Sequence, residues 1–221
     1  MKIEVLPPNV NKSKLRFCPE KLPSGKMAIR YGLAAIKNVG EGAMAVAIAN
    51  REENGPFEDM DDFSNRLDTK VVNKRILENL IKAGAMDWTG ETRASMDARL
   101  EKVIATASSS HKDRAAGQVS LFDSMDFGSA PEPEDAPLIL TEWPKEQRLD
   151  NEKELLGFYI SGHPLDAYRG IIDADMYTRI GLIDELDLSD RRKRHRFAGM
   201  IKHIEHKVTK AGKPFGVIHL E

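Results

Sequence analysis

The sequence has little of several features that define common protein classes. It contains one cysteine, Cys18, so no disulfide can form within the chain, which is typical of a reducing compartment. No apolar run approaches the ~20 residues of a membrane-spanning helix. The first residues also lack the charged and then apolar pattern of a signal peptide. These absences predict a cytoplasmic protein without a membrane partner.

Charge and motif content exclude further classes. The formal net charge of −2 gives no general attraction to nucleic acid, so any such site must be local. There is no phosphate-binding loop, nucleophile elbow or strand-associated pair of carboxylates, so we expect no catalytic residue and no cofactor. His203 and His206 are three apart on a predicted strand and therefore face opposite ways, which argues against a metal site.

What the chain does contain predicts a mainly α fold. Hydrophobic residues make up 41% and charged residues 31%, which is a globular composition. The sequence begins directly in a predicted strand and stops in the middle of another, which suggests that it is a piece of a longer protein. We expect an extended segment, a helical domain, a linker, a helical connector and a short β segment, at residues 1–31, 32–110, 111–142, 143–190 and 191–221.

Apolar residues at helical spacing predict the elements of the helical domain. One or two short helical turns at 32–37 precede three helices with buried faces, the last of which is capped by Asn73 and stops at Gly84. The middle one of the three is short and is lined by Phe57, Met60, Phe63 and Leu67. Thr92 caps a further helix, and Pro144 begins the helix of the connector. Near the end, Phe197–Ile201 and Phe215–Leu220 predict a β-hairpin around a turn at 210–213.

The strongest local motif of this domain is a glycine-containing turn between two helices. Glycines permit a tight turn and a close backbone approach to a phosphate, and the next helix begins at once, so its free amides face the anion. This helix-hairpin-helix pattern predicts a contact to DNA that does not read sequence, unless it is an ordinary glycine-rich turn. The residues are Lys37, Asn38, Val39, Gly40, Glu41 and Gly42.

Two further features belong to the same hypothesis. Lys70, Lys74 and Arg75 could contact the DNA backbone, although such a trio also suits a solvated helix face. A second turn, Ile81–Ala85, keeps one glycine and suggests a degenerate repeat that packs instead of binding. The basic run Arg191–Arg196 suits either a nucleic-acid patch or an exposed domain junction.

A short apolar peptide lies within the linker. Its neighbours are rich in serine, proline and acidic residues, a composition that favours a mobile segment. An apolar pair in such surroundings favours insertion into a partner's groove, rather than packing on the chain's own surface. The peptide is Gln118, Val119, Ser120, Leu121 and Phe122.

Several segments together resemble one family, the C-family replicative DNA polymerases that include the bacterial DNA polymerase III alpha subunit. They occur in the family's order and cover most of the chain. The matching segments are Val5–Pro8, Ile29–Gly40, Gly55–Phe57, Asn73–Arg75, Leu80–Ala85, Gln118–Phe122 and Glu154–Leu165.

The resemblance implies a stretch from the end of the fingers through the helix-hairpin-helix domain to the start of an OB-fold. It implies duplex DNA, the beta sliding clamp and other replicase subunits as partners. The palm domain, with its magnesium-binding aspartates, would lie upstream, so this piece would not be an enzyme by itself. Val119 departs from the leucine that is frequent in the clamp peptide. Two alternatives stay open: a stand-alone DNA-repair adaptor and an error-prone polymerase of the same family.

Overall fold

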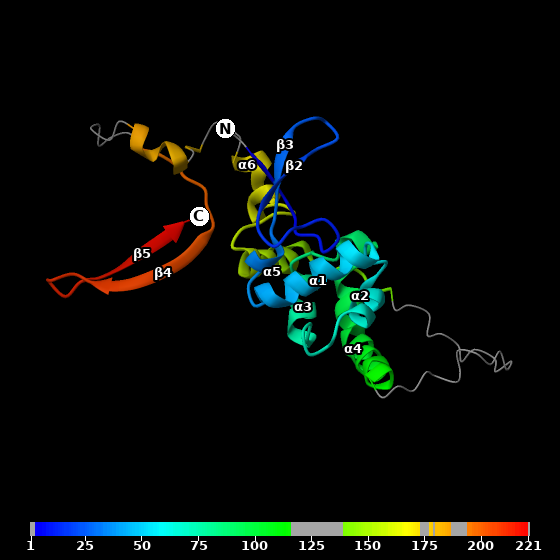
Figure 1. Cartoon of the computed structure of the whole chain (residues 1–221). Coiled ribbons are helices and arrows are strands. Elements are labelled where there is room, and N and C mark those ends of the chain that lie inside the picture. Colours follow the sequence, from blue (N-terminus) through cyan, green and yellow to red (C-terminus); the bar gives the residue numbers. More distant parts are fainter. Residues whose placement is uncertain (1–2, 116–138, 173–176, 179, 187–193, 221) are drawn as a thin grey trace. The chain divides into compact units, whose positions relative to one another are not determined.

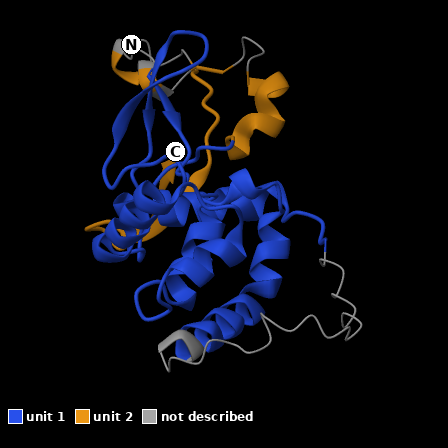
Figure 2. Ribbon diagram, turned by 45° about the vertical axis from the view of Figure 1, so that its right-hand side comes forward, with its two compact units in different colours: residues 1–161 blue, residues 162–221 orange. Residues whose placement is uncertain are grey.

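The computed structural model describes residues 3–115, 139–172, 177–178, 180–186 and 194–220 (Figure 1). The chain divides into two compact units, residues 1–161 and 162–221 (Figure 2). The mainly α fold class is confirmed: helices make up most of the first unit, and small sheets lie near both ends of the chain.

The first unit begins with a three-stranded sheet. Its strands are β1 (Glu4–Leu6), β2 (Cys18–Lys21) and β3 (Met27–Arg30), in the order β1-β3-β2. β1 runs parallel to β3, whereas β2 is antiparallel to it. Arg30 fixes the arrangement, because its guanidinium donates to both carboxylate oxygens of Glu20 (2.7 and 2.6 Å) and to the Pro7 carbonyl (2.9 Å). The sequence predicted extended structure over residues 1–31, with a strand at its start where β1 lies, and gave no separate strand at the position of β2.

The helices that follow match the predicted order (Figure 1). Their apolar faces form one core, in which Met44, Phe63, Leu77 and Met96 are fully buried. The elements are η1 (Leu33–Ala35), α1 (Glu41–Asn54), α2 (Met60–Arg66), α3 (Lys74–Lys82), η2 (Asp87–Thr89) and α4 (Arg93–Ala115).

The prediction of one or two helical turns at 32–37 is confirmed as a single 3-10 turn, η1, which stops because Ile36 has extended backbone angles. The prediction that Phe57 and Leu67 line the next short helix was wrong, because both are buried just outside the ends of α2. Extended Asp59 caps the start of α2 by accepting from the Asp62 amide at 2.7 Å, and extended Leu67 ends the helix.

The predicted helix caps are confirmed. The Asn73 side chain accepts from the Ile76 amide at 3.1 Å, and the Thr92 hydroxyl accepts from the Ser95 amide at 3.1 Å. Each cap satisfies a backbone donor that has no partner within its helix. α3 is followed by Gly84 at φ 75°, as the sequence indicated.

The chain returns after residue 138 along the N-terminal end of α4. The Leu140 amide donates to Ser95 Oγ (2.8 Å), and the Thr92 hydroxyl donates to the Leu140 carbonyl (3.0 Å). The Glu142 carboxylate accepts from the amides of Arg93 (3.0 Å) and Ala94 (3.3 Å) in the first turn of α4. A residue about fifty positions further along the chain thus helps to cap this helix.

Helix α5 (Lys145–Leu156) closes the first unit. It begins directly after Pro144, which confirms the predicted start, and its C-cap is Gly157, which adopts a left-handed φ of 85°. Leu149, Leu155 and Leu156 are buried, and the two last join the core formed by the earlier helices. Residues on either side of the linker therefore fold into one unit.

The second unit contains short helices and a hairpin. Its elements are η4 (Pro164–Tyr168), α6 (Arg169–Ile172), η5 (Ile180–Glu185), β4 (Ile201–Val208) and β5 (Pro214–Leu220). The hairpin turn is where the sequence placed it, with Gly212 at φ 75°. The first strand was predicted at Phe197 and instead begins at Ile201, with a pairing irregularity between Ile201 and His203. The start of β4 is defined by its pairing with β5, and a short apolar run in the sequence does not show where that pairing begins.

Within the part of the chain that the structure describes, no helix is both long and apolar enough to cross a membrane.

The Glu142 cap leads to a prediction about pH. Burial alone would raise the pKa of Glu142, but the amides of Arg93, Trp143 and Ala94 and the charge of Arg148 outweigh it and lower the pKa. A carboxylate with a lowered folded-state pKa stabilises the fold above its unfolded pKa, and this stability is lost as pH falls through the folded pKa. We therefore expect Glu142→Gln to lower the melting temperature at neutral pH. The difference in melting temperature between this variant and the wild type should become smaller in acid.

Melting curves across the acidic range test this prediction. Glu146→Gln is the control, because that exposed residue lies nearby on α5 and makes no cap. An equal loss of stability by Glu142→Gln at every pH would show that the charge of the carboxylate does not matter.

Candidate nucleic-acid interface

The turn that the sequence singled out lies between η1 and α1. Lys37 and Asn38 are exposed, whereas Val39 is fully buried and anchors the turn in the core. Asn38 adopts a φ of 64° and Gly40 a φ of 60°. Asparagine tolerates the left-handed region better than most residues and glycine adopts it freely. The turn therefore bends tightly while its outer residues stay accessible.

Helix α1 begins at this turn without a side-chain cap. Its N-cap is Gly40, which offers no hydrogen-bonding side chain, and Glu41 is the acidic residue of the first turn. The first helical amide with a backbone partner is that of Met44, which donates to the Gly40 carbonyl at 3.3 Å. The amides before it are the donors that a helix leaves for water or an anion.

The two glycines of this turn face open space. A Cβ built on Gly40 or on Gly42 meets no atom within 4 Å. Gly40 needs glycine for its φ of 60°, but Gly42 has an ordinary helical conformation. Glycine in a helix costs about 0.5–1 kcal/mol relative to alanine. Within the described structure, nothing next to Gly42 requires a residue without a Cβ.

The backbone of the turn is held from behind by α5. The Lys37 amide donates to the Leu155 carbonyl in the last turn of α5 at 2.9 Å. This contact uses a carbonyl that has no partner within its own helix. The Lys37 side chain is left exposed at the surface.

The second basic cluster surrounds the start of α3. Lys70, Lys74 and Arg75 are all exposed. Lys74 is not an isolated charge, because its Nζ pairs with the Glu101 carboxylate of α4, which raises the pKa of Lys74. None of the contacts between described residues joins this cluster to the Lys37–Gly42 turn. The structure therefore brings the trio together but does not combine it with the first turn.

The second glycine turn has the opposite character. Ala83 and Ala85 are buried, and a Cβ on Gly84 would lie 2.2 Å from Nη2 of Arg93 and 2.9 Å from the Asp87 carboxylate. The guanidinium of Arg93 already covers the surface of this turn. This turn packs inward, which is the reading that the sequence suggested for it.

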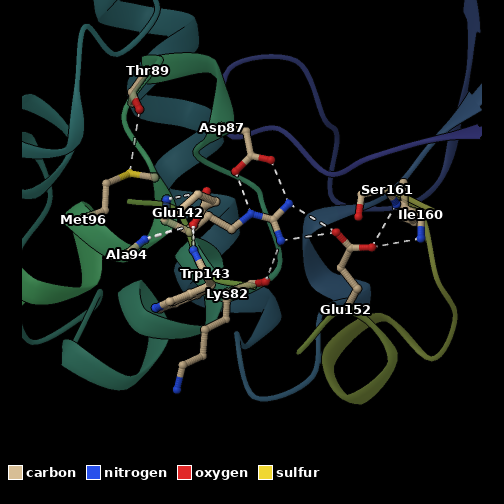
Figure 3. Close-up of polar contacts among 11 residues, drawn as sticks. Lys82, Asp87, Thr89, Ala94, Met96, Glu142, Trp143, Glu152, Ile160 and Ser161 are labelled. Carbon is tan, nitrogen blue, oxygen red and sulfur yellow. Dashed lines mark hydrogen bonds and ion pairs between the residues drawn. The ribbon is translucent and has the colours of Figure 1, made fainter. Parts of the chain in front are cut away.

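Arg93 makes a network of polar contacts with Asp87, Lys82 and Glu152, which are labelled in Figure 3. Its guanidinium makes two bonds to Asp87 (2.9 and 2.8 Å), one to the Lys82 carbonyl (3.2 Å) and two to Oε1 of Glu152 (both 3.2 Å). The side chains of Arg93 and Glu152 are only 4% and 2% exposed. Burial by itself would lower the pKa of Arg93, but Asp87 and Glu152 outweigh it and raise the pKa.

Glu152 uses its second oxygen to hold the end of the first unit. Oε2 accepts from the backbone amides of Ile160 (3.0 Å) and Ser161 (2.9 Å), as Figure 3 shows. Both oxygens of this buried carboxylate are thus paired, which offsets the cost of removing it from water. The network was not visible in the sequence, because Arg93 and Glu152 are far apart in the chain and neither forms part of a motif.

The remaining predicted sites divide between described and undescribed residues. Gln118, Val119, Ser120, Leu121 and Phe122 lie outside the described residues, as do Arg191–Lys193. Arg194 and Arg196 are exposed. Among the residues with described positions, no group of three or more histidine, cysteine or acidic side chains could hold a metal ion.

The contrast between the two turns gives a stability prediction with opposite signs. Gly42→Ala should stabilise the protein by about 0.5 kcal/mol, because alanine favours the helix and meets no neighbour. Gly84→Ala should destabilise it by at least ~1–2 kcal/mol, the cost of a left-handed conformation with a Cβ, in addition to the displacement of Arg93. Denaturant midpoints of the two variants measure both effects, and a loss of stability in both would refute the description of the first turn as open.

Comparisons with known proteins agree with this geometry. A family model described as a helix-hairpin-helix motif matches residues 2–96, which include both turns. The DNA polymerase III subunit alpha of Vibrio cholerae is 37% identical over 222 residues, covering 100% of this chain and 18% of that protein. The subunits of Mycobacterium tuberculosis and Aquifex aeolicus are 34% and 36% identical and cover 99% and 98% of the chain.

The chain spans only 18% of the length of the first two of these relatives and 16% of the third. The similarity runs through both units, including the linker within the first unit. Over its whole length, the chain is therefore similar to one segment of the bacterial DNA polymerase III alpha subunit.

Proposed function

We propose that this chain serves a replicative DNA polymerase by holding duplex DNA and by attaching the enzyme to a ring-shaped sliding clamp. The DNA contact lies at Lys37–Gly42, and the clamp contact lies at Gln118–Phe122. The polymerase activity itself belongs to the longer proteins that this chain resembles. Their palm domain and its magnesium ions lie outside this chain, which contributes binding and not catalysis.

The observation that supports the DNA contact best is Gly42. A glycine in a helix is destabilising and needs a reason, and the surrounding structure supplies none. A close approach by a phosphate supplies one, because a Cβ at this position would stand in front of the first free amides of α1. Gly84 is the internal comparison, since there the fold itself explains the missing side chain.

Charge and backbone geometry support the same proposal. The N-terminal end of a helix carries a partial positive charge, and Lys37 adds a full charge on an exposed side chain close in sequence. Contacts of this kind reach the DNA backbone and not the base edges, so binding is independent of sequence. Lys70 and Arg75 add charge at a second place on the same unit, while Lys74 is partly neutralised by Glu101.

The clamp contact rests on the sequence of the peptide and on the family resemblance. α4 ends at Ala115, three residues before Gln118, and the chain is anchored again at Leu140. Leu121 and Phe122 fill an apolar pocket, and Gln118 forms a hydrogen bond at its edge. Burial of the two large side chains contributes ~3–6 kcal/mol, and ordering of the peptide takes back a few kcal/mol. The peptide alone therefore binds in the micromolar range.

Gly42→Leu tests the DNA contact. A Cβ at this exposed position meets no atom within 4 Å, so we expect the fold to survive while the phosphate is kept away. We expect duplex affinity to fall about tenfold or more, since hydrogen bonds to a charged group are worth ~1.5–3 kcal/mol. Fluorescence anisotropy with a mixed-sequence duplex at low salt measures the effect. Ala49→Leu, which adds the same bulk to an exposed position further along α1, is the control.

The salt dependence identifies the kind of contact. Lys37→Ala should weaken binding to all sequences alike and reduce the salt slope by about one, the value expected for one lost phosphate contact. If Gly42→Leu binds duplex DNA as tightly as the wild type and its circular dichroism spectrum is unchanged, the turn is not the DNA site.

A separate substitution tests the clamp contact. Replacing Gln118, Leu121 and Phe122 with alanine should abolish heat release on mixing with a purified bacterial sliding clamp and leave duplex binding unchanged. Ser124→Ala with Met125→Ala, just beyond the peptide, is the matched control. Clamp binding at full affinity by the triple variant would place the contact elsewhere on the chain.

A further inference from the structure

The turn at Lys37–Gly42 and the segment that leads into it are each connected to α5 by one hydrogen bond within the described first unit. One joins the Lys37 amide to the Leu155 carbonyl at 2.9 Å. The other joins the hydroxyl of Tyr31 to the Leu156 carbonyl at 3.0 Å. The same hydroxyl lies 3.1 Å from the Ala35 carbonyl, at the end of η1, so its single proton is shared between two carbonyl acceptors. A single buried hydroxyl therefore contacts both the segment that leads into the turn and the helix that supports it.

The surroundings of Tyr31 separate the role of its hydroxyl from the role of its ring. The residue is 3% exposed. Its ring packs edge-on against Phe17, with centroids 4.6 Å apart, and lies 5.7 Å from the ring of Phe158. These aromatic contacts do not involve the hydroxyl. Removal of the oxygen alone should therefore leave the ring packed and delete only the bridge between the turn and α5.

The same C-terminal end of α5 is held by further contacts. Glu152, one turn before the end of the helix, is paired with Arg93 and with the amides of Ile160 and Ser161. The carbonyls of Leu155 and Leu156 are thus carried by a helix that cannot easily shift. A turn attached to such a helix is preorganised, and a preorganised site avoids the cost of ordering its backbone when a ligand binds.

We propose that Tyr31 is a positioning residue for the DNA-contacting turn, and that it acts through its hydroxyl bridge to the C-terminal end of α5. This inference rests on the proposed function. Tyr31 does not itself contact DNA in this account. It holds the backbone from Ala35 to Gly40 in place, so that the free amides of α1 and the Lys37 side chain meet a phosphate without rearrangement.

Tyr31→Phe tests the proposal in the full 221-residue chain. We expect duplex affinity to fall roughly fivefold, the factor that corresponds to one hydrogen bond of ~1 kcal/mol. The salt slope should equal that of the wild type, because the same phosphates are contacted. Hydrogen exchange should show the Lys37 amide losing protection, while the amides within α3 keep theirs.

A matched control distinguishes positioning from general stability. Ser64→Ala also removes a buried hydroxyl that donates to a backbone carbonyl, that of Met60 at 2.8 Å, but it lies in α2. This variant should bind duplex DNA as tightly as the wild type. An equal loss of affinity in Tyr31→Phe and Ser64→Ala would refute a specific role for Tyr31.

The Gly42→Leu variant separates failure of this inference from failure of the proposed function. Should Gly42→Leu lose DNA binding while Tyr31→Phe binds normally, the turn is the DNA site and Tyr31 does not position it. Should Gly42→Leu bind normally, the DNA contact itself is misplaced, and the role of Tyr31 fails with it.

Discussion

The rest of the first unit depends on the hydrogen bonds and ion pairs that the buried guanidinium of Arg93 makes. This guanidinium covers the Gly84 turn, caps the end of α3 through the Lys82 carbonyl and reaches Glu152 on α5. Removing one partner of a buried ion pair typically costs about 3–5 kcal/mol, since the other charge is left unpaired. The backbone amide of the same residue donates to Glu142, which anchors the chain where it returns from the linker. One residue thus joins the segments on both sides of the linker.

This arrangement explains why two similar glycine turns differ. The domain contains two turns that each lead from one helix to the next, and each includes at least one glycine. At Gly84 the space that an anion would need holds Arg93 with its two carboxylate partners. At Gly40 and Gly42 the space is open, and the helix behind it has no side-chain cap. The turn at Gly84 stabilises the unit, whereas the turn at Gly40 and Gly42 faces outward.

The sequence predicted the features that depend on neighbouring residues. Helical spacing located α1, α3, α4 and α5, and the caps Asn73 and Thr92 were found from the preference of such side chains for helix starts. The glycine turns were found because a left-handed conformation has a local signature. The family resemblance indicated that the chain corresponds to part of a longer protein, and the comparisons agree, since the similarity covers 100% of the chain and 18% of the Vibrio cholerae protein.

The sequence could not predict the features that depend on distant residues. The pairs Arg93–Glu152 and Tyr31–Leu156 join positions that are 59 and 125 residues apart, and charged or aromatic residues of these types occur throughout the chain. β2 escaped notice because a strand that contains Pro19 lacks the usual alternation. The open space around Gly42 is likewise a property of the fold, and it is this property that distinguishes the first turn from the second.

The central claim is that only the first turn faces a phosphate. Amide chemical-shift mapping of the isotopically labelled chain during titration with duplex DNA tests it most directly. We predict large shifts for the amides of Glu41, Gly42 and Ala43, small ones for Gly84 and Ala85, and the loss of both at high salt. Equal shifts at both turns, or shifts confined to Gly84 and Ala85, would contradict the account.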